Sequence, residues 1–269
     1  MLSSYQTILR IIMYLVNGCS FTYGDELERP ESQRWSAHLE ELADENVHNI
    51  AKCGSSNQKI FRTTIDALKK NKYEKMIIMW SDFARMEHIS LNAYFQYGKA
   101  GVEGISEDMT WMDEDAHTQV SPARLQAAPW RYKRETYEEY YSGIYTNYKG
   151  IYDTIDYMDH VCFLGKILGC KVYQGWFHEG NRMTWAKTFS DSQLGFHGDK
   201  LYRIKGLIEK KMIEWDGNSR IGLPGTNSET FNEFTTKGEY SVMPKGHPGP
   251  EAHKGYAKYL YDNFIMDKE

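Results

Sequence analysis

The sequence predicts an α/β fold built around a parallel β-sheet. Short apolar runs typical of buried strands alternate along the chain with segments whose apolar residues recur at helical spacing. Strands that alternate with helices form parallel sheets, because each crossover helix covers a face of the sheet. The 269 residues, 41% of them hydrophobic and 26% charged, suffice for one α/β core with insertions. We therefore expect a single domain over residues 1–269.

The first third of the chain shows this alternation most clearly. Ile11–Val16 and Met76–Trp80 are predicted strands, and a short strand between them ends near Gly54. The first predicted helix has an apolar face made of Trp35, Leu39 and Leu42. The second follows Ser55-Ser56-Asn57, which can cap a helix N-terminus, and carries the apolar stripe Ile60, Phe61, Ile65 and Leu68.

The rest of the chain has weaker patterns. Helical and strand periodicity fades over residues 85–134, as expected for a long insertion over one end of the sheet. Residues 135–168 contain Gly143, Gly150 and Gly165, which predict one or two interrupted helices. Residues 1–12 are expected to form a loosely attached extension. Further predicted elements are a strand at Lys171–Phe177, a helix near Leu201–Ile213, an irregular segment at Pro224–Gly238, and a last helix from Pro250 with Ala252, Tyr256, Tyr259, Leu260 and Phe264 on one face.

Composition argues against several kinds of partner. A formal net charge of −5 and a pI near 6.0 give no general attraction to nucleic acid or to anionic membranes, so neither is expected as a partner. The early apolar run Ile11–Val16 is too short for a signal peptide or a membrane span.

The cysteine and histidine patterns do not indicate a metal or a cofactor. The four cysteines are too irregularly spaced for a disulfide framework or a zinc site, which favours a reducing compartment. His160, His178 and His197 lack metal-ligand spacing, and we expect no metal and no cofactor. We expect a cytoplasmic or virion-associated protein with no signal peptide and no transmembrane segment.

The first candidate for chemistry is Ser20, in the stretch Gly18-Cys19-Ser20-Phe21-Thr22-Tyr23-Gly24-Asp25. This stretch follows the first strand, and ligands of open α/β folds bind at the carboxyl ends of strands. Small flanking residues let the backbone turn sharply and present its amides to a developing oxyanion. An ordinary strand-to-loop turn with a hydrogen-bonded serine is the structural alternative.

The second candidate is His247, in the stretch Gly246-His247-Pro248-Gly249-Pro250 before the last helix. The following proline favours extended geometry, so His247 should project from a loop. A solvated loop histidine is the alternative. A serine hydroxyl is a weak nucleophile and needs a base within hydrogen-bond reach, and His247 at the same sheet edge as Ser20 would meet that need.

At these positions the chain resembles the SGNH (GDSL-like) hydrolases. Gly18, Ser20, Thr22 and Gly24 match the opening block G-D-S-x-T-x-G, with Cys19 where Asp is usual. Gly54 stands at the second-block glycine, and His247-Pro248 before a helix is similar to the closing block D-x-x-H-P. The resemblance implies a flavodoxin-like three-layer sandwich, with Ser20 as nucleophile, His247 as base, and the amides of Ser20 and Gly54 in the oxyanion hole.

Two departures from the family pattern affect the mechanism. In the third block, G-x-N-D, Asp82 occupies the place of the asparagine that donates to the oxyanion, and a carboxylate would repel that charge. Arg85, Ser81 and Asn57 are the candidate substitutes. Arg85 is electrostatically the most useful of them, although an ion pair with Glu87 or Asp82 is the alternative for its side chain.

The second departure removes the acid of the closing block. Pro244 and Lys245 stand three and two residues before His247, and no Asp is present. The sequence leaves open a Ser-His dyad whose imidazole is held by a backbone carbonyl or by Glu239, of which Glu239 is the less favoured, and it does not identify a third triad member.

The leading hypothesis is a serine esterase or deacylase that acts on small acyl esters or acetylated carbohydrate. Ser81, Asp82 and His178 are candidate site-lining residues, because each follows a predicted strand. The alternative is a catalytically inactive binding or structural protein with the same fold, and a weaker one is an acyltransferase. The sequence does not predict an oligomeric state.

Overall fold

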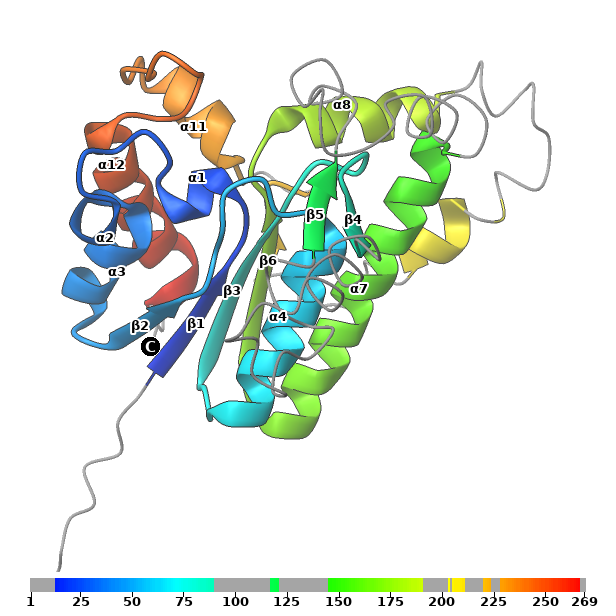
Figure 1. The fold of residues 1–269 in the computed structure, drawn as a ribbon, viewed down its shortest axis with the longest axis horizontal. Helices are drawn as coiled ribbons and strands as arrows, with labels where there is room; N and C mark the ends of the chain where they lie inside the picture. Colours follow the sequence, from blue (N-terminus) through cyan, green and yellow to red (C-terminus); the bar gives the residue numbers. More distant parts are fainter. Residues whose placement is uncertain are drawn as a thin grey trace, which may run out of the picture.

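The computed structural model describes residues 13–89, 117–120, 145–190, 203, 205–210, 220–223 and 228–266. Within them the chain forms an α/β structure with a parallel sheet at its centre (Figure 1). The strands of that sheet are β1 (Met13–Asn17), β2 (Asn46–Asn49), β3 (Lys75–Trp80), β6 (Lys171–Trp176) and β7 (Arg220–Ile221). A separate antiparallel pair consists of β4 (Met86–Ile89) and β5 (His117–Val120).

Helices cover both faces of the sheet. In Figure 1, α2, α3 and α12 lie on one face, and α4 and α7 lie on the other. The strand order is β2-β1-β3-β6-β7 and every neighbouring pair is parallel, as in flavodoxin-like folds. The predicted fold class, a three-layer α/β sandwich with a central parallel sheet, is confirmed. The helices are α1 (Ser20–Tyr23), α2 (Pro30–Gln33), α3 (Trp35–Ala43), α4 (Asn57–Lys70), α7 (Asn147–Leu168), α8 (Glu179–Thr188), α11 (Phe231–Lys237), α12 (Pro250–Leu260) and the π-helix Tyr261–Ile265.

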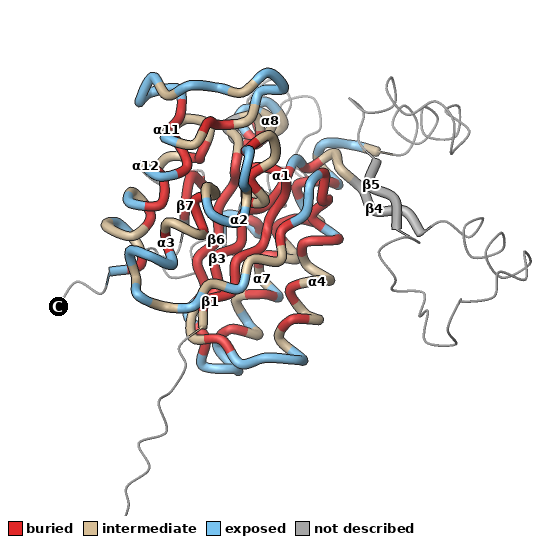
Figure 2. Tube along the Cα trace, turned by 60° about the vertical axis from the view of Figure 1, so that its left-hand side comes forward, coloured by how far each residue is buried: buried red, intermediate tan, exposed pale blue. Residues whose placement is uncertain are grey.

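The core consists of two apolar layers, one on each face of the sheet. Side chains of a strand point alternately to opposite faces. In β3, Met76 and Ile78 join the cluster under α4 and α7, whereas Ile77 and Met79 join the cluster under α3 and α12. Figure 2 shows the central strands as the buried part of the chain. A continuous apolar strand, as predicted for Met76–Trp80, is what burial on both faces requires.

The sequence predicted the start of α4 correctly but not the continuity of α7. Ser56 caps α4, because its Oγ accepts the N–H of Lys59 at 3.2 Å, which confirms the predicted cap. In contrast, the predicted interruption of residues 135–168 is wrong over their described part, since α7 is unbroken from Asn147 to Leu168. A Cβ at Gly150 would lie 2.6 Å from the carbonyl oxygen of Phe83, so this glycine permits close packing instead of ending the helix.

Two other sequence predictions need correction. The second strand ends at Asn49 and not near Gly54, because the chain leaves the sheet through a turn before α4. The segment Pro224–Gly238 was predicted as irregular, but it contains α11. Thr230 and Glu233 form a reciprocal capping box at the start of α11, which is a signal visible in the sequence.

Several predictions fall on residues that the structure does not describe. The predicted extension at residues 1–12 lies outside the described residues, and so does most of the insertion at 85–134. The described part of the segment near Leu201–Ile213 is helical at residue 203 and at 205–210. Within the described ranges, no helix combines the length and apolar character needed to cross a membrane.

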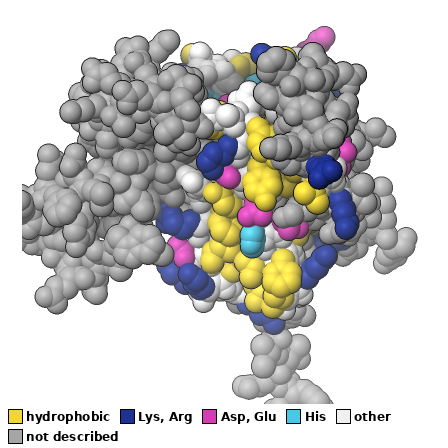
Figure 3. All heavy atoms as spheres, turned by 90° about the vertical axis from the view of Figure 1, so that its right-hand side faces the viewer, with side chains coloured by type: hydrophobic (Ala, Val, Ile, Leu, Met, Phe, Trp, Pro, Cys, Tyr) yellow, Lys and Arg dark blue, Asp and Glu magenta, His cyan; other side chains and the backbone are white. Residues whose placement is uncertain are grey.

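The outer side of α7 exposes large apolar side chains. Figure 3, which faces the right-hand side of Figure 1, shows hydrophobic side chains gathered along the middle of this surface, with basic side chains around them. The exposed large hydrophobic residues of α7 are Tyr152, Phe163, Ile167 and Leu168.

Asn17, the last residue of β1, fixes the strand end that leads to Ser20. Its Nδ2 lies 2.9 Å from three acceptors on α4, which are the carbonyl of Ile60 and the hydroxyls of Thr63 and Thr64. Its Oδ1 accepts the N–H of Gly18 at 2.8 Å. Because Asn17 is only 1% exposed, water cannot replace these hydrogen bonds if the side chain is removed.

We predict that Asn17→Ala lowers the free energy of unfolding by about 3 kcal/mol, because it leaves buried donors and acceptors unpaired. Urea denaturation measures the effect. Asn263→Ala is the matched control, since the Asn263 side chain is exposed and makes one hydrogen bond, to Tyr259, and it should cost less than about 1 kcal/mol. Equal effects of the two substitutions would contradict this role of Asn17.

Candidate active site

Ser20 opens a short helical turn at the carboxyl end of β1. The carbonyl oxygen of Cys19 accepts the N–H groups of Thr22 and Tyr23 at 3.0 and 2.9 Å, which closes the turn. Gly24 ends it with a φ of 87°, a conformation that favours glycine. Ser20 is 5% exposed, and its hydroxyl makes no hydrogen bond to any residue in the described part of the chain.

The turn lies tightly against the sheet, and Gly18 makes this close approach feasible. A Cβ at Gly18 would lie 2.3 Å from Oγ1 of Thr22 and 3.0 Å from the carbonyl oxygen of Met79. The first distance is shorter than packed atoms tolerate and the second is at the limit, so a side chain here would require Thr22 to move. The glycine at the start of the pattern Gly-x-Ser-x-Thr-x-Gly therefore allows the turn that carries Ser20 to pack against β3.

His247 lies next to this turn and is held by Glu26. The imidazole Nδ1 is 2.7 Å from Oε2 of Glu26, and the ring centroid of His247 is 5.1 Å from that of Phe21. The side chains of His247 and Glu26 are 13% and 7% exposed. The carboxylate that contacts His247 thus comes from the loop that follows the Ser20 turn, 221 residues earlier in the chain.

Backbone groups hold Glu26 in place. Its carboxylate accepts the amide N–H of Lys245 at 2.9 and 3.1 Å and that of His247 at 3.4 Å. Glu26 also has a φ of 70°, in the left-handed region that non-glycine residues seldom adopt. Such a conformation costs of order 1–3 kcal/mol and is typical of functional sites, where surrounding contacts maintain it.

These contacts determine the charge of Glu26 and the tautomer of His247. Desolvation raises the pKa of Glu26, but the hydrogen bonds from His247 and Lys245 outweigh it, and the net pKa is lowered. An ionised carboxylate only accepts hydrogen bonds, so Nδ1 of His247 carries a hydrogen and Nε2 of the neutral ring is left as the base. Nε2 lies 3.9 Å from Oδ2 of Asp25.

The loop that carries Gly54 is bonded to the loop of the nucleophile. The N–H of Lys52 donates to the carbonyl oxygen of Gly18 at 3.4 Å, and the Asn49 side chain donates to the carbonyl of Thr22 at 3.0 Å. Gly54 has a φ of 75°, and its own N–H makes no backbone hydrogen bond with the described residues. This amide is therefore free to serve as an oxyanion donor.

Asn57, a predicted oxyanion donor, uses its amide elsewhere. Its Nδ2 donates to the Ser81 carbonyl at 3.2 Å and to Oγ1 of Thr154 at 2.8 Å, while its Oδ1 accepts the N–H of Ser81 at 2.6 Å. Both amide hydrogens are occupied. Asn57 therefore joins α4 to the end of β3 and to α7, and has no donor left for a substrate.

Asp82 and Ser81 differ in how their side chains are used. The exposed Asp82 turns its carboxylate onto its own loop, where Oδ1 accepts the N–H of Ala84 at 2.7 Å. The hydroxyl of Ser81 is fully buried and has no hydrogen-bond partner in the described part of the chain. Ser81 thus keeps an unused donor at the strand end where the family pattern places its asparagine.

Arg85 and His178 lie at the same edge, around Phe177. The guanidinium carbon of Arg85 is 5.8 Å from the ring centroid of Phe177, and the rings of Phe177 and Phe21 are 4.5 Å apart. His178 caps α8 by accepting the N–H of Gly180 on Nδ1 at 2.8 Å, and its ring is 6.3 Å from that of Phe21. Among the described side chains, Arg85 forms no ion pair with Asp82, one of the two alternatives considered for it; the other, Glu87, has a side chain outside the described part of the structure.

The residue that contacts His247 was not among the predicted ones. Glu239, the less favoured of the two supports considered for His247, is exposed and has a φ of 52° in the turn after α11. Glu26 contacts the imidazole instead. The local sequence Asp25-Glu26-Leu27-Glu28 carries no sign of it, because its partner is 221 residues away and the choice among these acids depends on the loop conformation.

Comparisons with known proteins identify similar solved structures. No family model matches the sequence, and no curated protein is significantly similar to it. The psychrotrophic esterase EstA from Pseudoalteromonas sp. is 9% identical with a TM-score of 0.48, and the match covers 94% of this chain and 96% of that one. The acetylxylan esterase Axe2 from Geobacillus stearothermophilus is 13% identical with a TM-score of 0.45 and 95% of both chains covered.

A member of the lipolytic G-D-S-L family from Veillonella parvula DSM 2008 is 11% identical with a TM-score of 0.43, and the match covers 95% of this chain and 99% of that one. The chain is thus similar in structure to an esterase, an acetylxylan esterase and a member of the lipolytic G-D-S-L family. The fold class itself follows from the strand order and layers of this chain.

A second histidine, His253, fixes the helix that follows His247. It is fully buried in α12, and its Nδ1 accepts the N–H of Trp35 at 3.1 Å, which ties α12 to the start of α3. Burial, with smaller contributions from His38 and His247, lowers the pKa of His253 to about 3. His253 is therefore neutral in the folded protein throughout the neutral and mildly acidic range.

We predict that stability falls on acidification through His253. The unfolded imidazole has an ordinary pKa of 6.5, so between pH 6.5 and about 3 the unfolded chain binds a proton that the folded chain does not. The free energy of unfolding should therefore fall by up to about 1.4 kcal/mol per pH unit as the pH drops through this window, and not above it.

His253→Asn keeps an acceptor for Trp35 and removes the titration. Urea denaturation from pH 7 to pH 4 should show a flatter pH dependence for this variant than for the wild type. His160→Asn is the control, because the His160 side chain is 56% exposed. Parallel curves for the wild type and His253→Asn would contradict the prediction.

Proposed function

We propose that the protein is a serine ester hydrolase in which Ser20, His247 and Glu26 act together. The observation that supports this most strongly is the 2.7 Å contact between Nδ1 of His247 and the Glu26 carboxylate, beside the turn that carries Ser20. A histidine that only faces solvent has no need of a buried carboxylate beside it. A histidine that accepts a proton during catalysis needs such a carboxylate, because the carboxylate selects the tautomer of the imidazole and stabilises its charged form.

The proposed reaction is acyl transfer to water through Ser20. Oγ of Ser20 attacks the ester carbonyl carbon while Nε2 of His247 takes the hydroxyl proton. The tetrahedral intermediate places its negative oxygen against the amides of Ser20 and Gly54. When the C–O bond breaks, His247 returns the proton to the leaving alcohol, and a water molecule then repeats the sequence to release the acid.

The described geometry requires one movement for this step. In the structure Nε2 of His247 faces Asp25 at 3.9 Å, and no described residue bonds to the Ser20 hydroxyl. Nε2 must therefore turn from Asp25 toward Ser20 when substrate binds. Catalytic hydrogen bonds often tighten only in the substrate complex.

Small acyl esters and acetylated carbohydrate are the proposed substrates. The resemblance of the Ser20, Gly54 and His247 segments to SGNH hydrolases supports this class. The buried nucleophile, 5% exposed, favours a small acyl group at the point of attack.

We predict that the purified protein hydrolyses p-nitrophenyl acetate and that Ser20→Ala and His247→Ala abolish turnover. Glu26→Gln keeps the shape of the side chain but loses the charge that selects the tautomer, and kcat should fall on the order of 10²–10⁴-fold. Initial rates of nitrophenol release measure all three effects. Glu28→Gln, two residues farther along the same loop and exposed, is the charge-matched control and should leave kcat within about twofold.

Two outcomes would contradict this function. Turnover that survives Ser20→Ala would mean that another group attacks the ester. A wild-type protein that folds but does not turn over acyl esters would favour the alternative of a binding protein with the fold of a hydrolase, which the missing Asn and the missing closing-block Asp also allow.

A further inference from the structure

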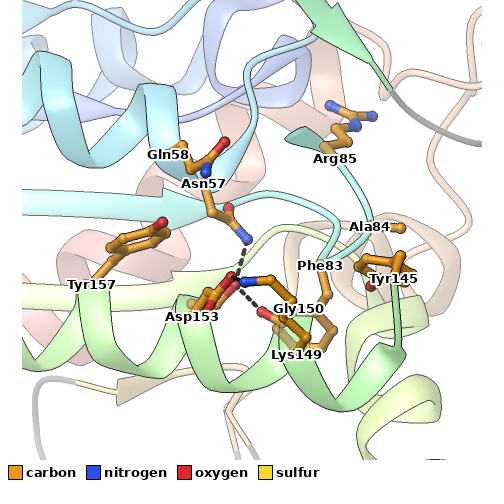
Figure 4. A pocket seen from close by; sticks show the side chains of 11 residues that line it. Asn57, Gln58, Phe83, Ala84, Arg85, Tyr145, Lys149, Gly150, Asp153 and Tyr157 are labelled. Carbon is orange, nitrogen blue, oxygen red and sulfur yellow. Dashed lines mark hydrogen bonds and ion pairs between the residues drawn. The ribbon is translucent and has the colours of Figure 1, made fainter. Parts of the chain in front are cut away.

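A pocket lies between α4, the loop after β3 and α7. Its volume is about 140 Å³, enough for several water molecules or a chemical group of similar size. Figure 4 shows Asn57 and Gln58 from α4 on one side, Arg85 from the loop on another, and Tyr157 and Asp153 from α7 below them. The lining is therefore part aromatic and part polar.

Arg85 lines this pocket, and no carboxylate of the described residues pairs with its guanidinium. Its Nη1 is buried and has no hydrogen-bond partner, and no ion pair engages its guanidinium in the described part of the chain. The other charged residues of the lining, Lys149 and Asp153, pair with each other at 2.5 Å. A guanidinium does not lose its proton in proteins, and a buried charged donor left unpaired is costly.

The pocket is connected to the proposed catalytic residues. Asn57 and Gln58 are the first two residues of α4, three and four positions after Gly54. On the other side, ring contacts lead from Arg85 to Phe177 at 5.8 Å, from Phe177 to Phe21 at 4.5 Å and from Phe21 to His247 at 5.1 Å. These contacts place Arg85 and His247 on opposite sides of the same aromatic pair, Phe177 and Phe21.

We propose that Arg85 binds a carboxylate of the substrate, so that the site selects acyl esters that carry a second, ionised carboxyl group. The inference rests on the proposed ester hydrolysis at Ser20. Guanidinium and carboxylate are matched in geometry, because two parallel N–H donors can reach the two oxygens. The guanidinium carbon of Arg85 lies 5.8 Å from the ring centroid of Phe177, and this contact leaves the buried Nη1 without a hydrogen-bond partner among the described residues.

The experiment compares charged and neutral esters of equal chain length. The p-nitrophenyl monoesters of glutaric and adipic acid are each compared with the neutral pentanoate and hexanoate. The wild type should have a kcat/KM at least about tenfold higher for the charged member of one pair. Arg85→Gln should abolish that preference, because kcat/KM should fall at least about tenfold more for the charged ester than for its neutral partner.

Two further variants make the result specific. Arg85→Lys keeps the charge but not the planar fork, and should retain only part of the preference. It also serves if Arg85→Gln fails to fold. Arg62→Gln, a charge-matched change on α4 at a residue that pairs with Asp66, should leave the preference intact. The proposal is overturned if the wild type shows no preference for the charged esters, or if Arg85→Gln lowers kcat/KM equally for both members of a pair.

A binding measurement separates this proposal from the proposed function. If no ester is turned over, calorimetric titration of the protein with glutarate tests carboxylate binding at Arg85 independently of ester hydrolysis. Binding by the wild type that is lost in Arg85→Gln supports the carboxylate site even in a protein without esterase activity. Absence of glutarate binding to the wild type in that case overturns it.

Discussion

The contact between Glu26 and His247 is the constraint on which the candidate site depends. It joins the loop after the first strand to the loop before the last helix, so that two ends of the chain meet at the carboxyl edge of the sheet. Different contacts hold the two residues in place. Gly18 and Asn17 set the turn that leads to Glu26, and α12, tied to α3 through His253, fixes the loop of His247.

This arrangement also explains how a carboxylate reaches His247 although the Asp of the SGNH closing block is missing from this sequence. A closing-block Asp would come from the same loop as the histidine. Here that loop contributes backbone amides instead, because the N–H groups of Lys245 and His247 hold the carboxylate of Glu26. The left-handed backbone of Glu26 and the lowered pKa of its carboxyl are the two physical signs that the surroundings impose this position.

Local sequence predicted the elements better than it predicted the partners within the site. The apolar run at Met76–Trp80 and the cap at Ser56 depend on neighbouring residues, and both predictions are confirmed. The glycines of α7 led to the wrong prediction of an interrupted helix. Their role is close contact with Phe83 and Val172, which lie outside the helix and cannot be identified from its local sequence. Glu26 was missed for the same reason, and Asn57 was assigned a free amide that long-range hydrogen bonds to Ser81 and Thr154 occupy.

The most direct test of the central claim is the tautomer of His247. In protein labelled with ¹⁵N in histidine, two-bond ¹H–¹⁵N correlations distinguish the two ring nitrogens at a pH where the ring is neutral. The account predicts a hydrogen on Nδ1, a bare Nε2, and loss of this preference in Glu26→Gln. A wild-type ring that carries its hydrogen on Nε2 would contradict the account, because Glu26 would then not prepare His247 to accept a proton from Ser20.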